Sequence, residues 1–431
     1  MSEGVDTVGL DSAPRLAVDG LLDDPGTRIV VCCGAGGVGK TTTAAALGVR
    51  AAERGRKVVV LTIDPARRLA QSMGIDSLDN TPREVGGVGA DGGGLHAMML
   101  DMKRTFDEIV EAHADGERAK AILANPFYQS LSAGFAGTQE YMAMEKLGQL
   151  RARDDWDLII VDTPPSRSAL DFLDAPKRLG SFLDGKFIRV LMAPAKVGGR
   201  AGMKFLNVGM SIMTGTLSKL MGASLLKDVQ TFVAAMDTMF GGFRTRADAT
   251  FRLLQAPGTA FLVVAAPEPD ALREAAYFVE RLAAEKMPLA GLVLNRVHGS
   301  GADQLSAERA LAAAENLEDG GIVDQESGKA GLRDSAHDAD DAGSPADTTD
   351  VATDDTPDSS LVVDEITAGL LRLHAERMQV IAREQRTRDR FTSLHPEVAV
   401  AEVAALPGDV HDLAGLRAIG ERLAAGVPTG A

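Results

Sequence analysis

The sequence has little cysteine and no long apolar run. Its 431 residues include two cysteines, Cys32 and Cys33, which are adjacent. Neighbouring residues in a strand point to opposite faces, so this pair neither forms a disulfide readily nor chelates zinc together, which excludes a disulfide framework. The chain does not begin with a basic segment followed by an apolar run, and no stretch approaches the roughly 18 to 20 apolar residues that cross a bilayer. We therefore expect a cytoplasmic protein.

Negative charge predominates but is unevenly distributed. The formal net charge is -16 at pH 7, which disfavours nucleic acid, so we expect no nucleic-acid partner. Residues 334–358 hold nine aspartates and no Lys or Arg, among Ser, Thr, Ala and Gly. Such a composition does not bury enough apolar surface to offset its ordering entropy, and we interpret 301–360 as an acidic disordered insertion. An acidic docking segment is the alternative interpretation.

Short apolar runs alternate with helical patterns along the chain. Runs of strand length occur at 28–33, 57–63, 95–100, 157–162, 260–265 and 291–295. Helical periodicity lies between them, as in 41–54 and 270–286. Continuous apolar runs are typical of strands covered on both faces, and this alternation predicts an α/β fold with a doubly wound, mostly parallel sheet.

A glycine-rich motif joins the first expected strand to the first expected helix. It reads GAGGVGKT from residue 34 to 41 and fits G-x-x-x-x-G-K-[ST]. In this motif the backbone N–H groups face phosphate oxygens, the lysine neutralises the β and γ phosphates, and the Thr hydroxyl ligates Mg²⁺. A glycine-rich turn without a ligand is the alternative. The predicted nucleotide-binding residues of this segment are Gly34, Ala35, Gly36, Gly37, Val38, Gly39, Lys40, Thr41 and Thr42.

Two aspartates follow later strands, at the edge where open α/β sheets bind ligands. Asp64 follows the second expected strand and Asp162 the fourth. Asp162 has the placement of a carboxylate that holds Mg²⁺ directly or through water, and Asp64 is a candidate for orienting the attacking water. Either aspartate alone is equally well explained as a turn or helix cap.

Four segments carry a family resemblance. They are GAGGVGKTTTAAALGVRAAERGRKVVVLTIDPARRL, DLIIVDTPPSRSALDFL, VVAAPEPDALREA and LVLNRV. They resemble the deviant-Walker-A P-loop ATPases of the arsenite-pump and tail-anchored-protein-targeting family, especially its actinobacterial branch, over roughly 27–300 and 395–425. The resemblance implies ATP and Mg²⁺ as cofactors and a dimer.

The same resemblance assigns roles to individual residues. It places Asp64 in switch I as the catalytic, water-orienting residue beside Lys40, and Asp162 in switch II as the magnesium-linked one, with Thr41 as the other metal ligand. Glu268 and Asn295 match positions that contact nucleotide in the family. A strand-ending cap is the alternative for Asn295.

Ala35 departs from the family pattern. The family usually has a lysine here that reaches across the dimer interface to the partner's nucleotide, and a methyl group supplies no such charge. Three explanations stay open: hydrolysis in the opposing site is slow, another cation substitutes, or a related subunit of a heterodimer carries the lysine. The candidate cations are Arg67, Arg68 and Arg167, for which a solvated or core-edge position is an equally good interpretation.

Two properties of related proteins are not expected here. Arsenite handling needs several thiolates brought together, and both thiols of this chain lie in the first expected strand. The targeting branch has a C-x-x-C zinc clasp at its dimer interface, and the sequence contains no such motif. We therefore expect neither arsenite sensing nor zinc.

Residues 185–227 are basic and rich in methionine, with seven Lys or Arg residues and no Asp or Glu. Methionine is over-used where one surface fits varied apolar ligands. One interpretation is a core packed by methionines beneath a solvated basic face. The other is a nucleotide-gated site for an apolar client segment or an anionic membrane surface, which would place the protein peripherally at the membrane.

We predict a Mg-ATP-binding and hydrolysing dimeric ATPase, homo- or heterodimeric, whose nucleotide state gates a helical subdomain for an apolar client or membrane-associated partner. A low-activity regulatory subunit of a heterodimer is the first alternative, and a partition or septum-positioning ATPase the second. The predicted domains are an N-terminal extension (1–26), the P-loop ATPase domain (27–165 and 256–300), the helical subdomain (166–255), the acidic insertion (301–360) and the C-terminal part of the ATPase domain (361–431).

Overall fold

A computed structural model of the chain describes residues 13–63, 68–89, 92–132, 138–164, 245–330 and 359–425. The chain divides into two compact units, passing from the first to the second after Val297 and returning after Arg386. The predicted helical subdomain lies outside the described residues except for a helix at 245–255. The predicted domain boundaries therefore stay predictions.

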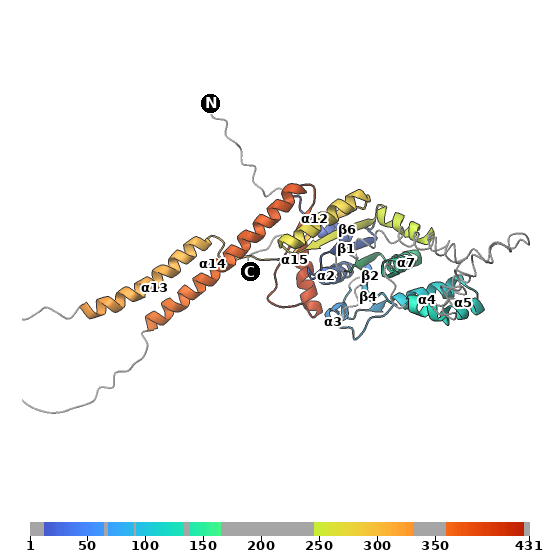
Figure 1. The fold of residues 1–431 in the computed structure, drawn as a ribbon, viewed down its shortest axis with the longest axis horizontal. Helices are drawn as coiled ribbons and strands as arrows, with labels where there is room; N and C mark the ends of the chain where they lie inside the picture. Colours follow the sequence, from blue (N-terminus) through green and yellow to red (C-terminus); the bar gives the residue numbers. More distant parts are fainter. Residues whose placement is uncertain are drawn as a thin grey trace, which may run out of the picture. The chain divides into compact units, whose positions relative to one another are not determined.

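The first unit is built on a sheet of eight strands in the order β3-β4-β2-β5-β1-β6-β7-β8 (Figure 1). All neighbouring strands are parallel except β3 and β4, which are antiparallel. The strands are β1 (Ile29–Gly34), β2 (Lys57–Thr62), β3 (Arg83–Glu84), β4 (Gly94–Met99), β5 (Leu158–Asp162), β6 (Thr259–Ala265), β7 (Leu289–Val297) and β8 (Val400–Ala404).

Helices connect these strands and cover the sheet. Helix α2 follows β1, and α12 joins β6 to β7, as the helical patterns of the sequence predict. The helices of this unit are α1 (Val18–Asp23), α2 (Lys40–Glu53), α3 (Arg68–Ser72), α4 (Met102–His113), α5 (Gly116–Leu123), α6 (Pro126–Ser132), α7 (Thr138–Arg153), α12 (Pro269–Ala284) and α15 (Leu413–Ala425).

The predicted fold class is confirmed, because each of the six expected strands forms and they lie side by side in the sheet, joined by five parallel pairings. Their continuous apolar runs are buried on both faces; every residue of β1, β5 and β6 is buried. Two strands were not anticipated. β8 alternates buried and half-buried residues, the pattern of an edge strand, and β3 has only two residues.

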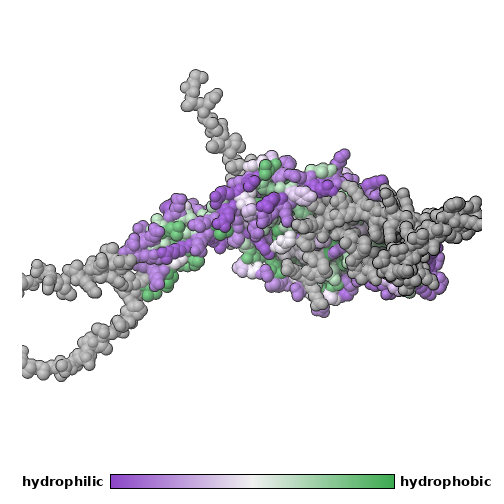
Figure 2. All heavy atoms as spheres, in the orientation of Figure 1, coloured by the Kyte–Doolittle hydropathy of each residue, from purple (hydrophilic) through white to green (hydrophobic). Residues whose placement is uncertain are grey.

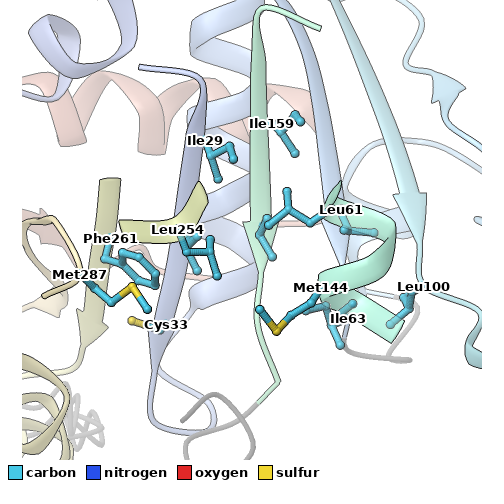
Figure 3. Packing of buried hydrophobic residues seen from close by; sticks show 14 of the residues in the cluster. Ile29, Cys33, Leu61, Ile63, Leu100, Met144, Ile159, Leu254, Phe261 and Met287 are labelled. Carbon is cyan, nitrogen blue, oxygen red and sulfur yellow. The ribbon is translucent and has the colours of Figure 1, made fainter. Parts of the chain in front are cut away.

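The hydrophobic core has one layer on each face of the sheet. On one face Ile29, Cys33 and Leu61 pack with residues of α4, α7 and α12, and Figure 3 shows Cys33 beside Phe261 and Met287. On the other face Cys32 packs with residues of α2 and α15. The two cysteines therefore point to opposite faces, as strand geometry requires, and each buried Leu or Ile contributes about 1.5–3 kcal/mol.

Helix α2 lies close against the sheet because its buried face is made of small residues. A Cβ atom added to Gly48 would lie 2.7 Å from a methyl carbon of Val60, so only glycine allows this approach. The buried alanines around it extend the close contact along the helix. This packing fixes the N-terminus of α2, which begins at Lys40, at the carboxyl edge of the sheet.

The second unit contains an antiparallel helical hairpin. Helix α13 (Ala307–Ala330) and most of α14 (Ser359–Leu394) form its two arms (Figure 1). An ion pair of 2.6 Å joins Arg372 to Glu318, and the ring Nε2 of His374 donates to the Leu305 carbonyl at 2.8 Å. Among the described side chains of this unit, the buried ones are mostly small: Ala310 and Ala314 of α13, and Ala368, Ala375 and Ile381 of α14.

Helix α13 differs from the expectation of a disordered insertion over 301–360. The aspartate-rich composition that motivated the expectation is confined to 334–358, whereas α13 begins with an alanine- and glutamate-rich segment of high helix propensity. The aspartate-rich segment itself lies outside the described residues, as do all of residues 331–358.

Candidate functional site

The loop between β1 and α2 has the backbone geometry of a phosphate-binding loop. Gly37 and Gly39 adopt left-handed conformations, with φ of 77° and 96°, and Gly39 is the N-cap of α2. A Cβ added to Gly39 would lie 2.2 Å from the Nδ2 atom of Asn295. Glycine is thus required at 39 both by conformation and by space, and the turn directs the first N–H groups of a 14-residue helix outward from the sheet edge.

Lys40 is held against this loop. Its side chain is buried, with 7% of the residue exposed, and Nζ donates to the carbonyl oxygen of Ala35 at 2.7 Å. Burying an ammonium group is costly unless its charge is balanced. The buried ammonium group of Lys40 therefore puts a positive charge at the loop, where an anionic phosphate would balance it.

Asp162 connects the loop to the two strands beside it. Its Oδ2 atom accepts hydrogen bonds from the hydroxyls of Thr41 (2.7 Å) and Thr62 (2.8 Å), and the residue is fully buried. Asp162 lies opposite Cys32 of β1 and Thr62 of β2 in the sheet register. The two predicted metal ligands, Thr41 and Asp162, are therefore brought together.

These donors fit a magnesium ion bound with a nucleotide. Mg²⁺ prefers hard oxygen ligands and is usually held by one or two protein side chains together with substrate phosphates and water. The hydroxyl of Thr41 and the carboxylate of Asp162 are such ligands, and they lie beside the turn of left-handed glycines that a phosphate approaches.

Thr62 is a positioning residue that the sequence did not reveal. Its hydroxyl fixes the same carboxylate oxygen that Thr41 contacts. A threonine inside an apolar strand has no distinguishing sequence signal, because β-branched residues are common in strands. Only the pairing of β2 with β5 places it opposite Asp162.

Asn295 packs against the loop from the other side. Its Nδ2 atom donates to the Val38 carbonyl at 2.8 Å. The next residue, Arg296, has a left-handed backbone with φ of 62°, and the register of β7 with β8 shifts at this point. Such a bulge re-aims a side chain at the cost of local strain. The bulge explains how a strand residue reaches the loop, while the contact of Asn295 with a nucleotide stays a prediction.

Glu268 is placed differently. It is the N-cap of α12, exposed, and its side chain makes no capping hydrogen bond to that helix. Asp64, Arg67 and Arg167 lie outside the described residues, as does the side chain of Arg68. Their assigned roles stay predictions.

Ala35 contributes to the loop through its backbone carbonyl, not through its side chain. The residue is 9% exposed and belongs to the core layer that contains residues of α2, while its carbonyl oxygen accepts a hydrogen bond from Lys40. No charged group is present at this position.

The two cysteines are poorly suited to metal or arsenite chemistry, which requires thiolates. Burial raises the pKa of the Cys33 thiol to about 12. Burial, and then the negative charge of Asp162, hold the pKa of the Cys32 thiol well above its ordinary value. In the part of the chain that the structure describes, no cluster of three His, Cys, Asp or Glu side chains suits a metal ion. The expected absence of zinc remains a prediction.

Membrane association rests on the sequence alone. Within the ranges that the structure describes, no helix has the length and apolar character to cross a membrane. The basic, methionine-rich residues 185–227 lie outside those ranges.

Comparison with known proteins identifies relatives of a large part of the chain. Residues 27–318 match the family described as anion-transporting ATPase. A protein of Podospora anserina named ATPase GET3 is 25% identical over 308 residues, which cover 70% of this chain and 83% of that protein.

Two further relatives are matched over shorter segments. A Malassezia globosa protein of the same name is 29% identical over 173 residues, 40% of this chain and half of that protein. A Cryptosporidium parvum protein named ATPase ASNA1 homolog is 27% identical over 268 residues, 61% of this chain and 63% of that protein.

Proposed function

Because the chain belongs to the anion-transporting ATPase family and is therefore an ATPase, we propose that it hydrolyses Mg-ATP as a dimer and uses its nucleotide state to gate a site for an apolar client. The observation that carries the magnesium part of the proposal is the hydrogen bond from the Thr41 hydroxyl to Oδ2 of Asp162, next to the buried Lys40. The dimer and the client rest on the family resemblance and on the composition of 166–255.

Each residue at the loop has a distinct task in this proposal. The backbone N–H groups at the start of α2 bind phosphate oxygens, and Lys40 exchanges its bond to the Ala35 carbonyl for the β and γ phosphates. Thr41 and Asp162 would hold a magnesium ion, which would supply positive charge beside the phosphates. Thr62 keeps the Asp162 carboxylate in one orientation, and Asn295 fixes the loop through the Val38 carbonyl.

Asp64 is the proposed residue that orients the attacking water. It lies two residues after Thr62, the last residue of β2, which contacts Asp162. A switch segment that begins at this point would sense the γ phosphate through the same carboxylate. Glu268, exposed after β6, is proposed to contact the nucleotide at a greater distance from the loop.

The client site is proposed to lie in 166–255. The helix at 245–255 ends this interval, and its Ala247 and Leu254 are buried in the core layer that also holds α7 and α12. The interval is thus tied to the sheet at its carboxyl end, and it follows Asp162 at its amino end. Both attachments would transmit a change at the nucleotide site. We also propose that the protein is cytoplasmic. Its basic segment, 185–227, would contact the client or an anionic membrane surface.

Ala35 favours a second candidate function, a nucleotide-binding subunit of a heterodimer with low activity of its own. The position that would supply a cation to a partner carries a methyl group packed into the core. In that case the related subunit supplies the missing charge.

Steady-state hydrolysis by the isolated chain distinguishes the two candidates. The wild type is compared with Asp64→Asn and with Asp76→Asn, an exposed aspartate outside the loop that serves as the control. The enzyme proposal predicts ATP turnover that Asp64→Asn reduces at least ~10²-fold and Asp76→Asn leaves unchanged. Equal rates near background in all three would support the regulatory subunit.

A further inference from the structure

Helix α14 has two apolar faces, and only one of them is covered. The small residues Ala368 and Ala375 are buried on one face. A second row remains in solvent, and we call it the α14 stripe. Its residues, with their exposed fractions, are Val363 (59%), Ile366 (58%), Leu370 (61%), Leu373 (63%) and Val380 (39%). Hydrophobic residues are visible on the surface of this helix pair in Figure 2.

The α14 stripe follows a heptad spacing. Its members are separated by three, four, three and seven residues, and Arg377 occupies the position that the last interval skips. Apolar side chains at this spacing form a seam that a second helix covers by knobs-into-holes packing. Five large apolar side chains at one exposed face are unusual in a monomer and mark a contact surface.

Arg377, which lies within the stripe, is held by a hydrogen bond to the backbone. Its Nε atom donates to the Gly299 carbonyl at 2.7 Å, which anchors the guanidinium within the chain. Its aliphatic stem then contributes apolar surface, as long basic side chains commonly do.

Charge along α14 favours one direction of pairing. Residues 359–371 contain Asp364 and Glu365 and no basic residue, whereas 372–386 contain four arginines and two glutamates. Two copies in parallel would place like halves together. Two copies in antiparallel orientation place the acidic half of each beside the basic half of the other.

We propose that the α14 stripe pairs antiparallel with the same stripe of a second copy of this chain. The spacing is symmetric about the point between residues 371 and 372, so one register aligns the whole stripe. In that register Val363 lies opposite Val380 of the partner subunit, Ile366 opposite the stem of the partner's Arg377, and Leu370 opposite the partner's Leu373. The pairing uses no residue of the phosphate loop and is independent of the proposed function.

Sedimentation velocity of the full chain without nucleotide tests the pairing. The wild type associates with rising concentration, and Leu370→Glu/Leu373→Glu raises the dissociation constant at least ~10-fold, because four carboxylates would face each other in the seam. The matched control is Gln379→Glu/Gln385→Glu, which adds the same charge at exposed positions off the stripe and leaves association unchanged.

A wild type that stays monomeric at the highest concentration reached overturns the proposal, because the stripe is then covered by another segment or partner. Equal association of the two double variants also overturns it. Circular dichroism of the stripe variant confirms that α14 remains helical.

Cysteine crosslinking tests the direction. Val363→Cys and Val380→Cys chains with different tags are mixed and oxidised, while the native Cys32 and Cys33 remain buried. Antiparallel pairing predicts a mixed disulfide between the two chains. Disulfides within each kind alone would show parallel pairing, and no disulfide would show that the stripes do not meet; either result overturns the proposal.

Discussion

The two units of the chain bury opposite kinds of side chain. At the carboxyl edge of the sheet, Lys40, Thr62, Asp162 and Asn295 are buried polar groups within an apolar core. On α14 the large apolar side chains of the stripe are in solvent, whereas the small Ala368 and Ala375 are buried. Burying polar groups costs free energy unless they are paired, whereas exposing a row of apolar groups forfeits burial energy. Each exception to ordinary burial therefore marks a contact: a polar ligand in the first unit and an apolar partner in the second.

The largest effect is expected at Lys40. Lys40→Ala removes the charge at the β and γ phosphates and should lower ATP affinity by ~10²-fold or more, since charge-assisted bonds to phosphate are strong. Isothermal titration calorimetry measures the affinity. Lys120→Ala, on the exposed surface of α5, should bind as the wild type does. An affinity of Lys40→Ala within a few-fold of wild type would refute the assignment of the loop.

Substitution of Gly37 and of Gly39 should lower the free energy of unfolding by different amounts. Gly39→Ala places its Cβ 2.2 Å from Asn295 Nδ2 at a left-handed backbone, whereas a Cβ at Gly37 meets nothing within 4 Å. We expect Gly37→Ala to cost about 1–2 kcal/mol from conformation alone and Gly39→Ala clearly more.

Trp156 is the single tryptophan of the chain and lies in the first unit, so its fluorescence during urea unfolding reports the stability of that unit. Equal losses in the two glycine variants would show that Asn295 does not pack against the loop.

In the helical hairpin, enlarging a small buried side chain should cost more stability than truncating a large exposed one. Ala375→Leu inserts a large side chain at a fully buried position and should cost about 1–3 kcal/mol by overpacking. Leu373→Ala, two residues away on the exposed stripe, should cost under about 0.5 kcal/mol in the monomer. Hydrogen exchange of α14 measures both, and ATP affinity should change in neither. Equal protection in the two variants would contradict the assigned faces of α14.

The smallest effect is a pH dependence within the first unit. The Arg50 side chain donates to both oxygens of Asp19, at 2.5 and 2.7 Å, and these bonds hold the pKa of Asp19 below its ordinary value. The stabilisation is present above the unfolded pKa of about 4 and is lost as the pH falls through the folded value. Asp19→Asn should cost under about 1 kcal/mol at pH 7, because the pair is partly exposed, and nothing at low pH. Trp156-monitored unfolding at several pH values checks this, and a cost independent of pH would exclude the ion pair as its source.

The sequence predicts the sheet well because buried parallel strands are continuous apolar runs and the phosphate loop is a local motif. It predicts the contact between Thr41 and Asp162 because both residues lie at the same edge of the sheet. The contact of Thr62 with Asp162 and the bulge that turns Asn295 toward Val38 arise from strand register, which spacing along one strand does not encode. Helix α13 was missed because nearby aspartates dominated the composition of the segment.

The magnesium dependence of ATP binding tests the central claim most directly, namely that Thr41 and Asp162 hold the metal beside the phosphate loop. Calorimetry with and without Mg²⁺ compares the wild type with Thr41→Val and Asp162→Asn. We predict that Mg²⁺ strengthens ATP binding to the wild type and strengthens it ~10-fold less in either variant, while the affinities without Mg²⁺ stay similar. An equal gain from Mg²⁺ in all three proteins would contradict the account.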